Sequence, residues 1–264
     1  MEQIKIKVYA KINLALDIVG VRDDGYHELD MLNSSADIFD TITACKSDEN
    51  RVFMNGEQVY DDNTALKTLQ ILQRNFNINM EVQIEKGIPF SAGLGGSSAD
   101  ASGVFFCAHK LYGIPLDTLQ SLAVKVGCDV PYMIIGGGAR VQGVGEIVEP
   151  CQVPRLTLAI CQKEYGASTK EIYSTYDKIG AFPKSGDNFN ALEKSAISLN
   201  PNIQIAKEKL LEFTDKVFMT GSGSAYVGVF NSLEEAKRCV DSLGDDFIFK
   251  AVAQTKDRGI EIIK

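Results

Sequence analysis

The chain has 264 residues, of which 45% are hydrophobic and 23% are charged, which is the composition of an ordinary globular protein. Its 27 Lys and Arg residues against 35 Asp and Glu residues give a net charge of −8, so it lacks the overall basic field that attracts nucleic acid, and an anionic ligand must be held by local groups. No apolar window reaches the length of a membrane span, so no membrane partner is expected. The six cysteines are scattered and there are only two histidines, which argues against structural zinc. Reduced cysteines in a cytoplasmic protein are therefore expected.

The first half of the chain predicts strands and helices in mixture, read from hydrophobic spacing of two or of three to four residues. In chain order we expect strands at 3–9 and 12–19, a helix at 64–76, a strand at 80–85, a glycine-rich loop, a helix of about four turns ending at Gly113, a helix from 116 to 127, and two short strands within 132–148.

The second half predicts a smaller unit of the same kind. Strands are expected at 155–162, 216–220, 225–230 and 247–253, and helices at 168–178, 201–213 and 233–241. Two prolines bracket a turn at 149–155, which is the best candidate for a domain boundary. The sequence therefore predicts an α+β protein with an N-terminal domain at 1–152 and a C-terminal domain at 153–264.

The loop "IPFSAGLGGSSADASGVFF", residues 88–106, carries the strongest local signal. Its glycines let the backbone curl tightly and approach a ligand closely, and Ser97 or Ser98 stands where a helix N-cap belongs, with Ser97 and Asp100 in capping-box spacing. Uncapped N–H groups at the start of a helix bind phosphate. A flexible turn followed by an ordinary cap fits the composition equally well, so the residues alone leave both interpretations open.

The piece "PFSAGLGGSSAD" from Pro89 resembles the ATP loop of the GHMP kinases. The resemblance implies ATP as co-substrate and Mg²⁺ as its counter-ion, with either Ser97 or Ser98 as the contact to the metal. It also implies an Asn ahead of the first helix and a Lys ahead of the loop as contacts to the adenine base. The ATP-binding residues implied in this way are Asn63, Lys86, Pro89, Ala92, Gly93, Leu94, Gly95, Gly96, Ser97 and Ser98. The residues alone make Asn63 a helix N-cap.

Three further blocks narrow the resemblance. "AKINLALDIVGVRDDGYHELDML" at 10–32, "GCDVPYMIIGGGARVQGVGEIVEP" at 127–150 and "MTGSGSAYVGVF" at 219–230 are similar, in order, to blocks of the 4-diphosphocytidyl-2-C-methyl-D-erythritol kinase family. The resemblance implies the two-domain GHMP fold with its site in the cleft between the domains. It further implies phosphorylation of the 2-hydroxyl of a cytidine diphosphate substrate in non-mevalonate isoprenoid synthesis. The sequence leaves open whether the protein is a monomer or a homodimer.

Lys11 and Asp129 are the catalytic residues that the resemblance implies. A carboxylate can accept the proton of a substrate hydroxyl, and a nearby ammonium stabilises that carboxylate and the charge on the moving phosphoryl group. Asn13 lies two residues after Lys11, on the same strand face, and is implied as a ligand of the substrate hydroxyl. Without the family, Lys11 would be a solvated strand lysine and Asp129 a carboxylate at a helix end.

Recognition of the cytosine base is implied for "DGYH", where Tyr26 would stack and His27 would contact the base. Tyr173 is implied as the aromatic on the other face, and Gly221, Ser222 and Gly223 as a turn that closes over the substrate. On the residues alone, that turn is a β-hairpin. His109 is expected to be a surface or satisfied structural histidine.

Two alternatives remain open from the sequence. One is a diverged GHMP kinase that acts on another alcohol. The other is a non-catalytic ligand sensor with the same fold, against which the presence of both Lys11 and Asp129 argues.

Overall fold

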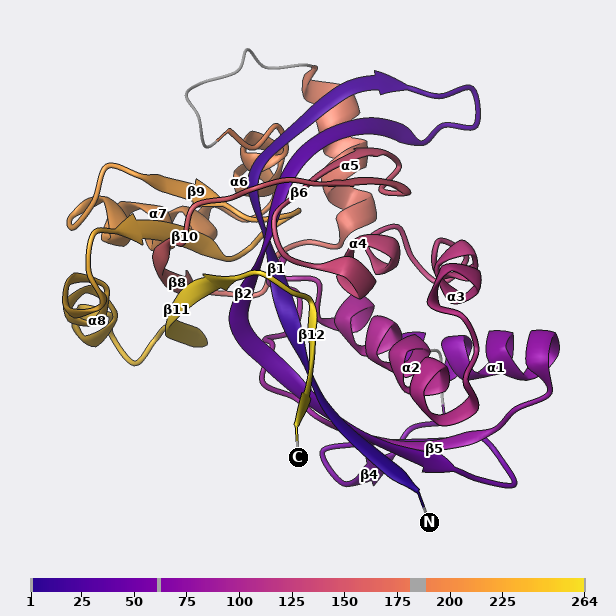
Figure 1. The fold of residues 1–264 in the computed structure, drawn as a ribbon. Coiled ribbons are helices and arrows are strands. Elements are labelled where there is room, and N and C mark those ends of the chain that lie inside the picture. Colours follow the sequence, from indigo (N-terminus) through magenta and orange to yellow (C-terminus); the bar gives the residue numbers. More distant parts are fainter. Residues whose placement is uncertain (1, 61–62, 181–188, 264) are drawn as a thin grey trace.

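The computed structural model describes residues 2–60, 63–180 and 189–263, and two long strands organise it. Strands β1 (Gln3–Val21) and β2 (His27–Lys46) pair antiparallel and cross the whole molecule (Figure 1). The two separate strands predicted at 3–9 and 12–19 are therefore one strand. A shift of register between Tyr9 and Ala10 changes the pairing there without ending the strand.

The other strands extend this hairpin into one sheet of twelve strands within the described part of the chain. Their order is β4-β3-β5-β2-β11-β8-β10-β9, while β12 joins β1, β6 joins the N-terminal part of β2, and β7 joins β6. Their bounds are β3 Arg51–Met54, β4 Glu57–Gln58, β5 Met80–Glu85, β6 Ala139–Gly143, β7 Ile147–Pro150, β8 Thr157–Gln162, β9 Val217–Met219, β10 Tyr226–Phe230, β11 Phe249–Lys256 and β12 Ile260–Ile263.

The helices form two groups, one beside each half of the sheet (Figure 1). The N-terminal group is α1 (Thr64–Phe76), α2 (Gly96–Tyr112), α3 (Leu116–Ala123) and α4 (Val130–Ile135). The C-terminal group is α5 (Thr169–Ile179), α6 (Glu193–Leu199), α7 (Gln204–Leu211), which follows a 3₁₀ turn at Pro201–Ile203, and α8 (Leu233–Ser242). Among the described residues, no helix combines the length and apolarity that crossing a bilayer requires.

Helix α2 is the centre of the N-terminal half. It is buried on most of its circumference, as expected of a core helix rather than of a surface helix. Gly103 allows its close approach to the sheet, because a Cβ atom at that position would lie 2.4 Å from Ile42 and 2.7 Å from Val8. The helix start, and the glycine loop that precedes it, are thereby fixed against β1.

Several predicted elements are confirmed and others are corrected. The helices at 64–76, 168–178 and 233–241 and the strand at 80–85 appear within a residue or two of their predicted bounds. The segment Val130–Ile135 is a helix, so only the latter part of the predicted strand region at 132–148 forms strands. Strand β2 was not predicted, because its run of polar residues, Asn33 to Ser35, resembles a loop; these side chains are buried instead.

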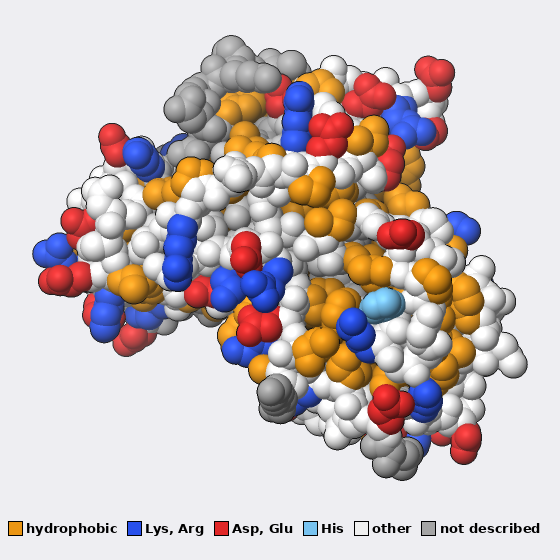
Figure 2. Space-filling view, in the orientation of Figure 1, with side chains coloured by type: hydrophobic (Ala, Val, Ile, Leu, Met, Phe, Trp, Pro, Cys, Tyr) orange, Lys and Arg blue, Asp and Glu red, His pale blue; other side chains and the backbone are white. Residues whose placement is uncertain are grey.

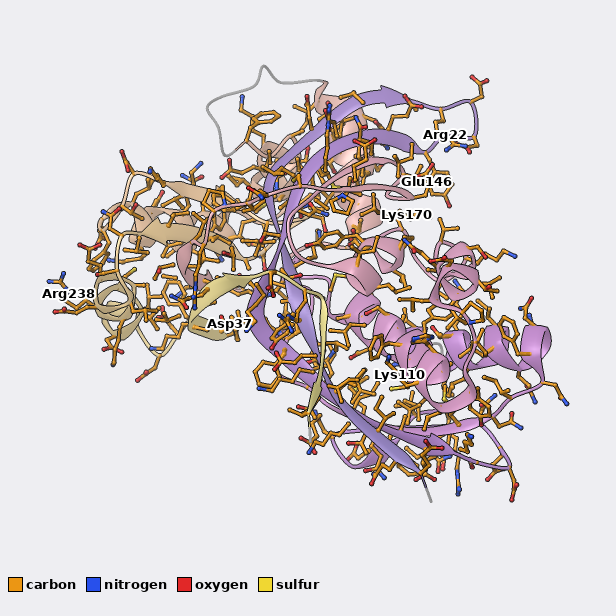
Figure 3. All side chains as sticks on the ribbon, in the orientation of Figure 1. Arg22, Asp37, Lys110, Glu146, Lys170 and Arg238 are labelled. Carbon is orange, nitrogen blue, oxygen red and sulfur yellow. The ribbon has the colours of Figure 1, made fainter. Side chains whose placement is uncertain are left out.

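Charged side chains of both signs are interspersed over the face shown in Figure 2. Figure 3 shows Arg22 at the tip of the β1–β2 hairpin and Glu146 in the β6–β7 turn, and their side chains form an ion pair at 3.6 Å. This pair connects the hairpin tip with the turn that follows β6.

Candidate active site

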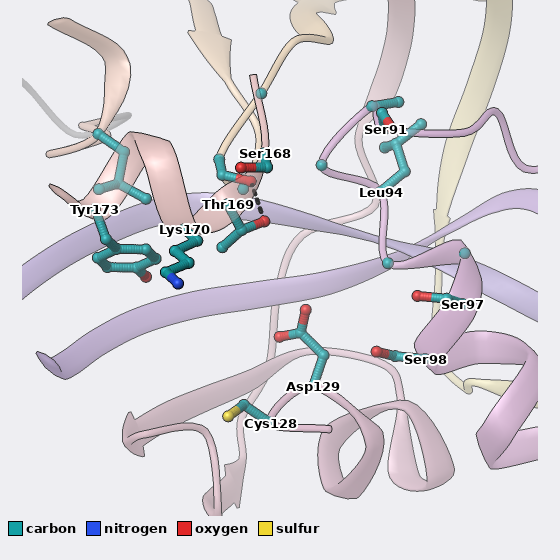
Figure 4. Close-up of a pocket in the computed structure, with 18 of the residues that line it drawn as sticks. Ser91, Leu94, Ser97, Ser98, Cys128, Asp129, Ser168, Thr169, Lys170 and Tyr173 are labelled. Atoms are coloured by element: carbon teal, nitrogen blue, oxygen red, sulfur yellow. Dashed lines mark hydrogen bonds between the residues drawn. The ribbon is translucent and has the colours of Figure 1, made fainter. Parts of the chain in front are cut away.

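A cleft of about 1100 Å³ lies between the two halves of the molecule. Its walls come from segments far apart in the sequence: β1, the glycine loop, the start of α4, the start of α5 and the β9–β10 turn. Figure 4 shows Asp129 in this cleft opposite Thr169 and Lys170, with Ser97 and Ser98 at its side. The glycine turn is therefore open to a ligand rather than filled by neighbouring side chains.

The glycine loop is held from both sides by backbone contacts. Gly93 and Gly95 have left-handed φ angles of 75° and 72°, which only glycine adopts without strain. A Cβ atom at Gly93 would lie 2.1 Å from the backbone oxygen of Thr220, and one at Gly95 would lie 2.9 Å from Cγ of Lys11. Lys11 also donates its backbone N–H to the oxygen of Leu94 at 3.0 Å. Glycine is required at positions 93 and 95 because the loop passes between β1 and the β9–β10 turn, where a side chain would not fit.

Helix α2 begins without a side-chain cap, which corrects the predicted cap and capping box. Its N-cap is Gly95, and no side chain of the described residues hydrogen-bonds to the first amides. Asp100 points away to Lys86 instead. The hydroxyls of Ser97 and Ser98 project from the helix start toward the side on which Asp129 lies (Figure 4). Uncapped amides at the positive end of a helix of this length form a site for phosphate.

Lys11 and Asp129 are brought together by the fold. Nζ of Lys11 lies 3.7 Å from Oδ2 of Asp129. Lys11 is only 4% exposed, whereas about one third of the Asp129 side chain is exposed, on the side of the cleft. Asp129 occupies the N-cap position of α4, next to Pro131 at the start of that helix. An exposed strand lysine is thus ruled out, and the pair has one partner buried and the other open to a ligand.

Asn13 connects the ammonium to the β9–β10 turn. Its Oδ1 accepts hydrogen bonds from Lys11 Nζ at 2.6 Å and from the backbone N–H of Gly221 at 2.8 Å. Its backbone N–H donates to Thr220, and its Nδ2 donates to Asn33 at 2.7 Å. All these groups are buried, so the network fixes the Lys11 side chain and the glycine turn relative to each other.

Lys86 lies beneath the glycine loop in a buried cluster of three charged residues. Its ammonium donates to Asp40 at 2.5 Å and to Asp100 at 2.7 Å, while the other Asp40 oxygen accepts the backbone N–H groups of Gly87 and Ile88. Burial raises the pKa of Asp100 to about 8, against the opposing charge of Lys86. Burial lowers the pKa of Lys86, but the charges of Asp100 and Asp40 outweigh it and raise this pKa.

Lys86 and Asn63 both line the cleft, but each already has partners there. The ammonium of Lys86 is engaged by carboxylates, and Asn63 caps α1 by accepting the N–H groups of Ala65 and Leu66 with its Oδ1. The cap uses only the oxygen of the amide, and within the described residues no partner is found for the Asn63 amide NH₂, which can act as a donor.

The tyrosine and histidine of "DGYH" lie at the opposite end of the cleft. Tyr26 is 60% exposed, whereas His27 is enclosed by α5. The His27 ring packs on Tyr173 with 4.8 Å between centroids, and its Nε2 lies 2.6 Å from Oδ1 of Asp177. Tyr173 thus contacts His27, while Tyr26 presents a free ring at the mouth of the cleft.

The turn Gly221–Gly223 is the connection of a β-hairpin, because β9 and β10 pair antiparallel. It contacts the glycine loop directly, and the hydroxyls of Ser222 and Thr169 share a hydrogen bond at 3.0 Å. His109 lies outside the cleft, with Nδ1 bonded to the oxygen of Ile114, and is structural as expected.

The sequence analysis missed Lys170, a residue of the cleft wall, and Asn190, a residue behind it. Lys170 extends its ammonium into the space between Tyr173 and Asp129 (Figure 4). Asn190 donates to the backbone oxygens of Met219 and Gly221 and so supports the β9–β10 turn. The only signal for Lys170 was its place in the first turn of a predicted helix, which by itself says nothing about a ligand.

A resident metal centre built from side chains alone is not found in the described residues, since no group of three or more His, Cys, Asp or Glu is placed to hold one. The cleft does hold oxygen donors suited to a hard cation, namely the Ser97 and Ser98 hydroxyls and the Asp129 carboxylate. These donors fit Mg²⁺ only when phosphate oxygens of a nucleotide complete its shell.

Comparison with known proteins places this geometry in a family. Residues 63–137 match the family model of the GHMP kinase N-terminal domain, and residues 159–248 match that of the GHMP kinase C-terminal domain. The 4-diphosphocytidyl-2-C-methyl-D-erythritol kinase of Thermoanaerobacter pseudethanolicus is 32% identical, with 99% of each chain covered. The enzyme of the same name from Clostridium botulinum is 32% identical, with 95% of this chain and 99% of the relative covered.

Solved structures agree with this similarity. A crystal structure of 4-(cytidine 5'-diphospho)-2C-methyl-D-erythritol kinase superposes with a TM-score of 0.82 at 26% identity, covering 95% of this chain and 98% of that one. Homoserine kinase from Cytophaga hutchinsonii shares the fold, with a TM-score of 0.72 at 15% identity over 100% of this chain and 98% of that one. The predicted α+β GHMP fold is confirmed.

Proposed function

Because the chain belongs to the GHMP kinases and, among them, to the 4-diphosphocytidyl-2-C-methyl-D-erythritol kinase family, we propose that it transfers the γ-phosphate of ATP to the 2-hydroxyl of 4-diphosphocytidyl-2-C-methyl-D-erythritol. It is an ATP-dependent small-molecule kinase. The observation that carries the chemistry is the Lys11–Asp129 pair at 3.7 Å beside the uncapped start of α2.

Asp129 accepts the proton of the attacking hydroxyl in this proposal. Its carboxylate is open to the cleft on one side, where it can accept the hydroxyl proton, and faces the buried Lys11 ammonium at 3.7 Å on the other. Asn13 holds the ammonium in place through its 2.6 Å hydrogen bond. Lys11 therefore orients the base and also lowers the energy of negative charge that develops on the phosphoryl group.

The glycine loop holds the triphosphate. The amides of the first turn of α2 and the positive end of its dipole are directed at the same space as the Ser97 and Ser98 hydroxyls. Mg²⁺, when bound with ATP, would neutralise phosphate charge, with one of these two serines among its contacts. The adenine lies beyond the loop, where Asn63 offers its amide NH₂ and Lys86 lies in the wall.

The substrate lies across the cleft from the nucleotide. Tyr26 offers an exposed ring on which the cytosine stacks, and His27 contacts the base edge. Lys170 lies between this end and Asp129, so its ammonium binds the diphosphate of the substrate. Asn13 and the turn Gly221–Gly223 position the alcohol. In this proposal the cleft is formed by two domains, with their boundary near residue 152.

A substrate panel tests this proposal. The purified chain with ATP and Mg²⁺ is offered the cytidylyl alcohol, mevalonate and homoserine in turn, and ADP formation is followed. We expect turnover of the cytidylyl alcohol alone, and a loss of about 10²–10⁴-fold in kcat for Asp129→Asn. Turnover of mevalonate or homoserine instead would identify a diverged kinase, and nucleotide binding without any phosphoryl transfer would identify a ligand sensor.

A further inference from the structure

The helix α5 encloses the His27 ring from three sides. Tyr173, Tyr176 and Asp177 stand at positions i, i+3 and i+4 of this helix and so share one face. Tyr173 packs on the ring at 4.8 Å, and Tyr176 meets it edge-on at 6.1 Å. Asp177 Oδ1 approaches Nε2 at 2.6 Å. The ring has therefore one orientation, determined by a helix from the other half of the molecule.

The Asp177 contact also determines where the ring proton lies. A carboxylate can only accept a hydrogen bond, so the bond at 2.6 Å requires the proton on Nε2. In the neutral ring the other nitrogen, Nδ1, is then an acceptor. Among the described residues no hydrogen bond to Nδ1 is found, and His27 lines the cleft, so this acceptor is available to a ligand.

We propose that Asp177 is a positioning residue which, by holding the His27 proton on Nε2, makes the cleft select cytosine over uracil. The proposal rests on the proposed function, since it concerns the same base site. Cytosine carries an exocyclic amine, a donor, at the ring position where uracil carries a carbonyl oxygen, an acceptor. An Nδ1 acceptor matches the amine, whereas it faces the uracil oxygen with a second acceptor and leaves both unpaired.

The kinetic test compares the cytidylyl substrate with its uridylyl counterpart at pH 8. For the unmodified chain we expect a strong preference for the cytidylyl compound in kcat/KM. In Asp177→Asn the amide occupies the same place, but it can either accept a hydrogen bond from a protonated Nε2 or donate one to an unprotonated Nε2. The variant therefore no longer holds the ring proton on Nε2, and the proton can move to Nδ1. We expect this variant to lose about 10- to 100-fold of the preference, mainly by gaining turnover of the uridylyl compound. Lys178→Ala, at the next, exposed position of α5, serves as the matched control and should leave the preference unchanged.

A spectroscopic test reads the tautomer directly. The chain has only two histidines, so ¹⁵N-labelled imidazole spectra contain two rings, and His27→Gln assigns them. We expect the Nε2–H form for His27 in the unmodified chain and a mixture of forms in Asp177→Asn. A purely structural role of Asp177 would change melting temperature without changing either the tautomer or the base preference.

The outcomes separate the two proposals. An Nδ1–H tautomer in the unmodified chain, or an undiminished preference in Asp177→Asn despite normal turnover of the cytidylyl substrate, overturns the role of Asp177 and leaves the proposed function intact. Absence of turnover of the cytidylyl substrate by the unmodified chain overturns the proposed function and the base selection together.

Discussion

Gly93→Ala tests the claim that the glycine loop and the β9–β10 turn are in direct backbone contact. The added methyl group would lie 2.1 Å from the Thr220 oxygen and 3.1 Å from the Gly223 nitrogen, so the two segments must separate. Gly113→Ala is the matched control. Gly113 has nearly the same φ, 71° against 75°, but a Cβ atom there meets nothing within 4 Å.

The expected magnitudes follow from these two environments. The left-handed conformation alone costs about 1–2 kcal/mol in either variant. Insertion of a methyl group against rigid backbone adds about 1–3 kcal/mol in Gly93→Ala only. For a chain of this size each kcal/mol lowers the melting temperature by about 2–4 °C. Gly113→Ala should therefore lose about 2–8 °C, and Gly93→Ala several degrees more.

Activity should separate the two variants further. Displacement of the phosphate-binding amides by about 1 Å is enough to cost on the order of 10² in rate, so Gly93→Ala should lose at least that in kcat/KM while Gly113→Ala stays within threefold. Thermal melts and steady-state kinetics on both variants measure this. Equal melting temperatures together with equal activities would refute the close contact between loop and turn.

The remaining predictions concern three side chains. Lys11→Met keeps the aliphatic stem against Gly95 and removes the charge, so kcat should fall about 10²–10³-fold with the melting temperature little changed; an unaltered kcat in steady-state assays would contradict the role of the ammonium. Tyr26→Ala should raise the KM for the cytidylyl substrate about tenfold with kcat within threefold, because stacking is already present in the ground state; a collapse of kcat at constant KM would argue against stacking. Burial raises the pKa of Asp100 from its ordinary 3.8 to about 8, so its favourable contribution to folding is complete below pH 4 and is lost as the pH rises toward 8. Asn at this position cannot ionise. The melting temperature of Asp100→Asn minus that of the unmodified chain should therefore increase from pH 5 to pH 9 in thermal melts. A difference that stays constant over this range would contradict the raised pKa.

Local sequence patterns were sufficient where one element carries its own signal. The helix at 64–76 and the strand at 80–85 are found as predicted, because their hydrophobic spacing matches a single buried face. The pattern failed for β2, where buried Asn33 and Ser35 find partners from other segments: Asn33 Oδ1 accepts from Asn13, and Ser35 Oγ accepts from the Gly137 N–H. A polar residue that is satisfied by a distant partner has the same appearance in sequence as a loop residue.

The predicted cap of α2 failed for a related reason. Ser97 and Asp100 have capping-box spacing, but Asp100 accepts a hydrogen bond from Lys86, whose other partner, Asp40, lies on β2. Capping rules consider only neighbours along the chain, so they cannot weigh such a competitor. The consequence is functional, because the first amides of α2 are left for phosphate.

The sequence by itself determined the chemistry that is present: a glycine-rich helix start, a lysine and a carboxylate in motifs of a kinase family, and an adjacent tyrosine and histidine. Only the tertiary structure decided which of these groups meet, since Lys11 and Asp129 are 118 positions apart in the numbering (129 − 11) and are joined through β1, α4 and the buried amide of Asn13. It also revealed Lys170 and Asp177, whose importance comes from the packing of α5 across the cleft. Side-chain types are written into the chain residue by residue, whereas distances between remote residues arise from burial of apolar surface by the whole chain.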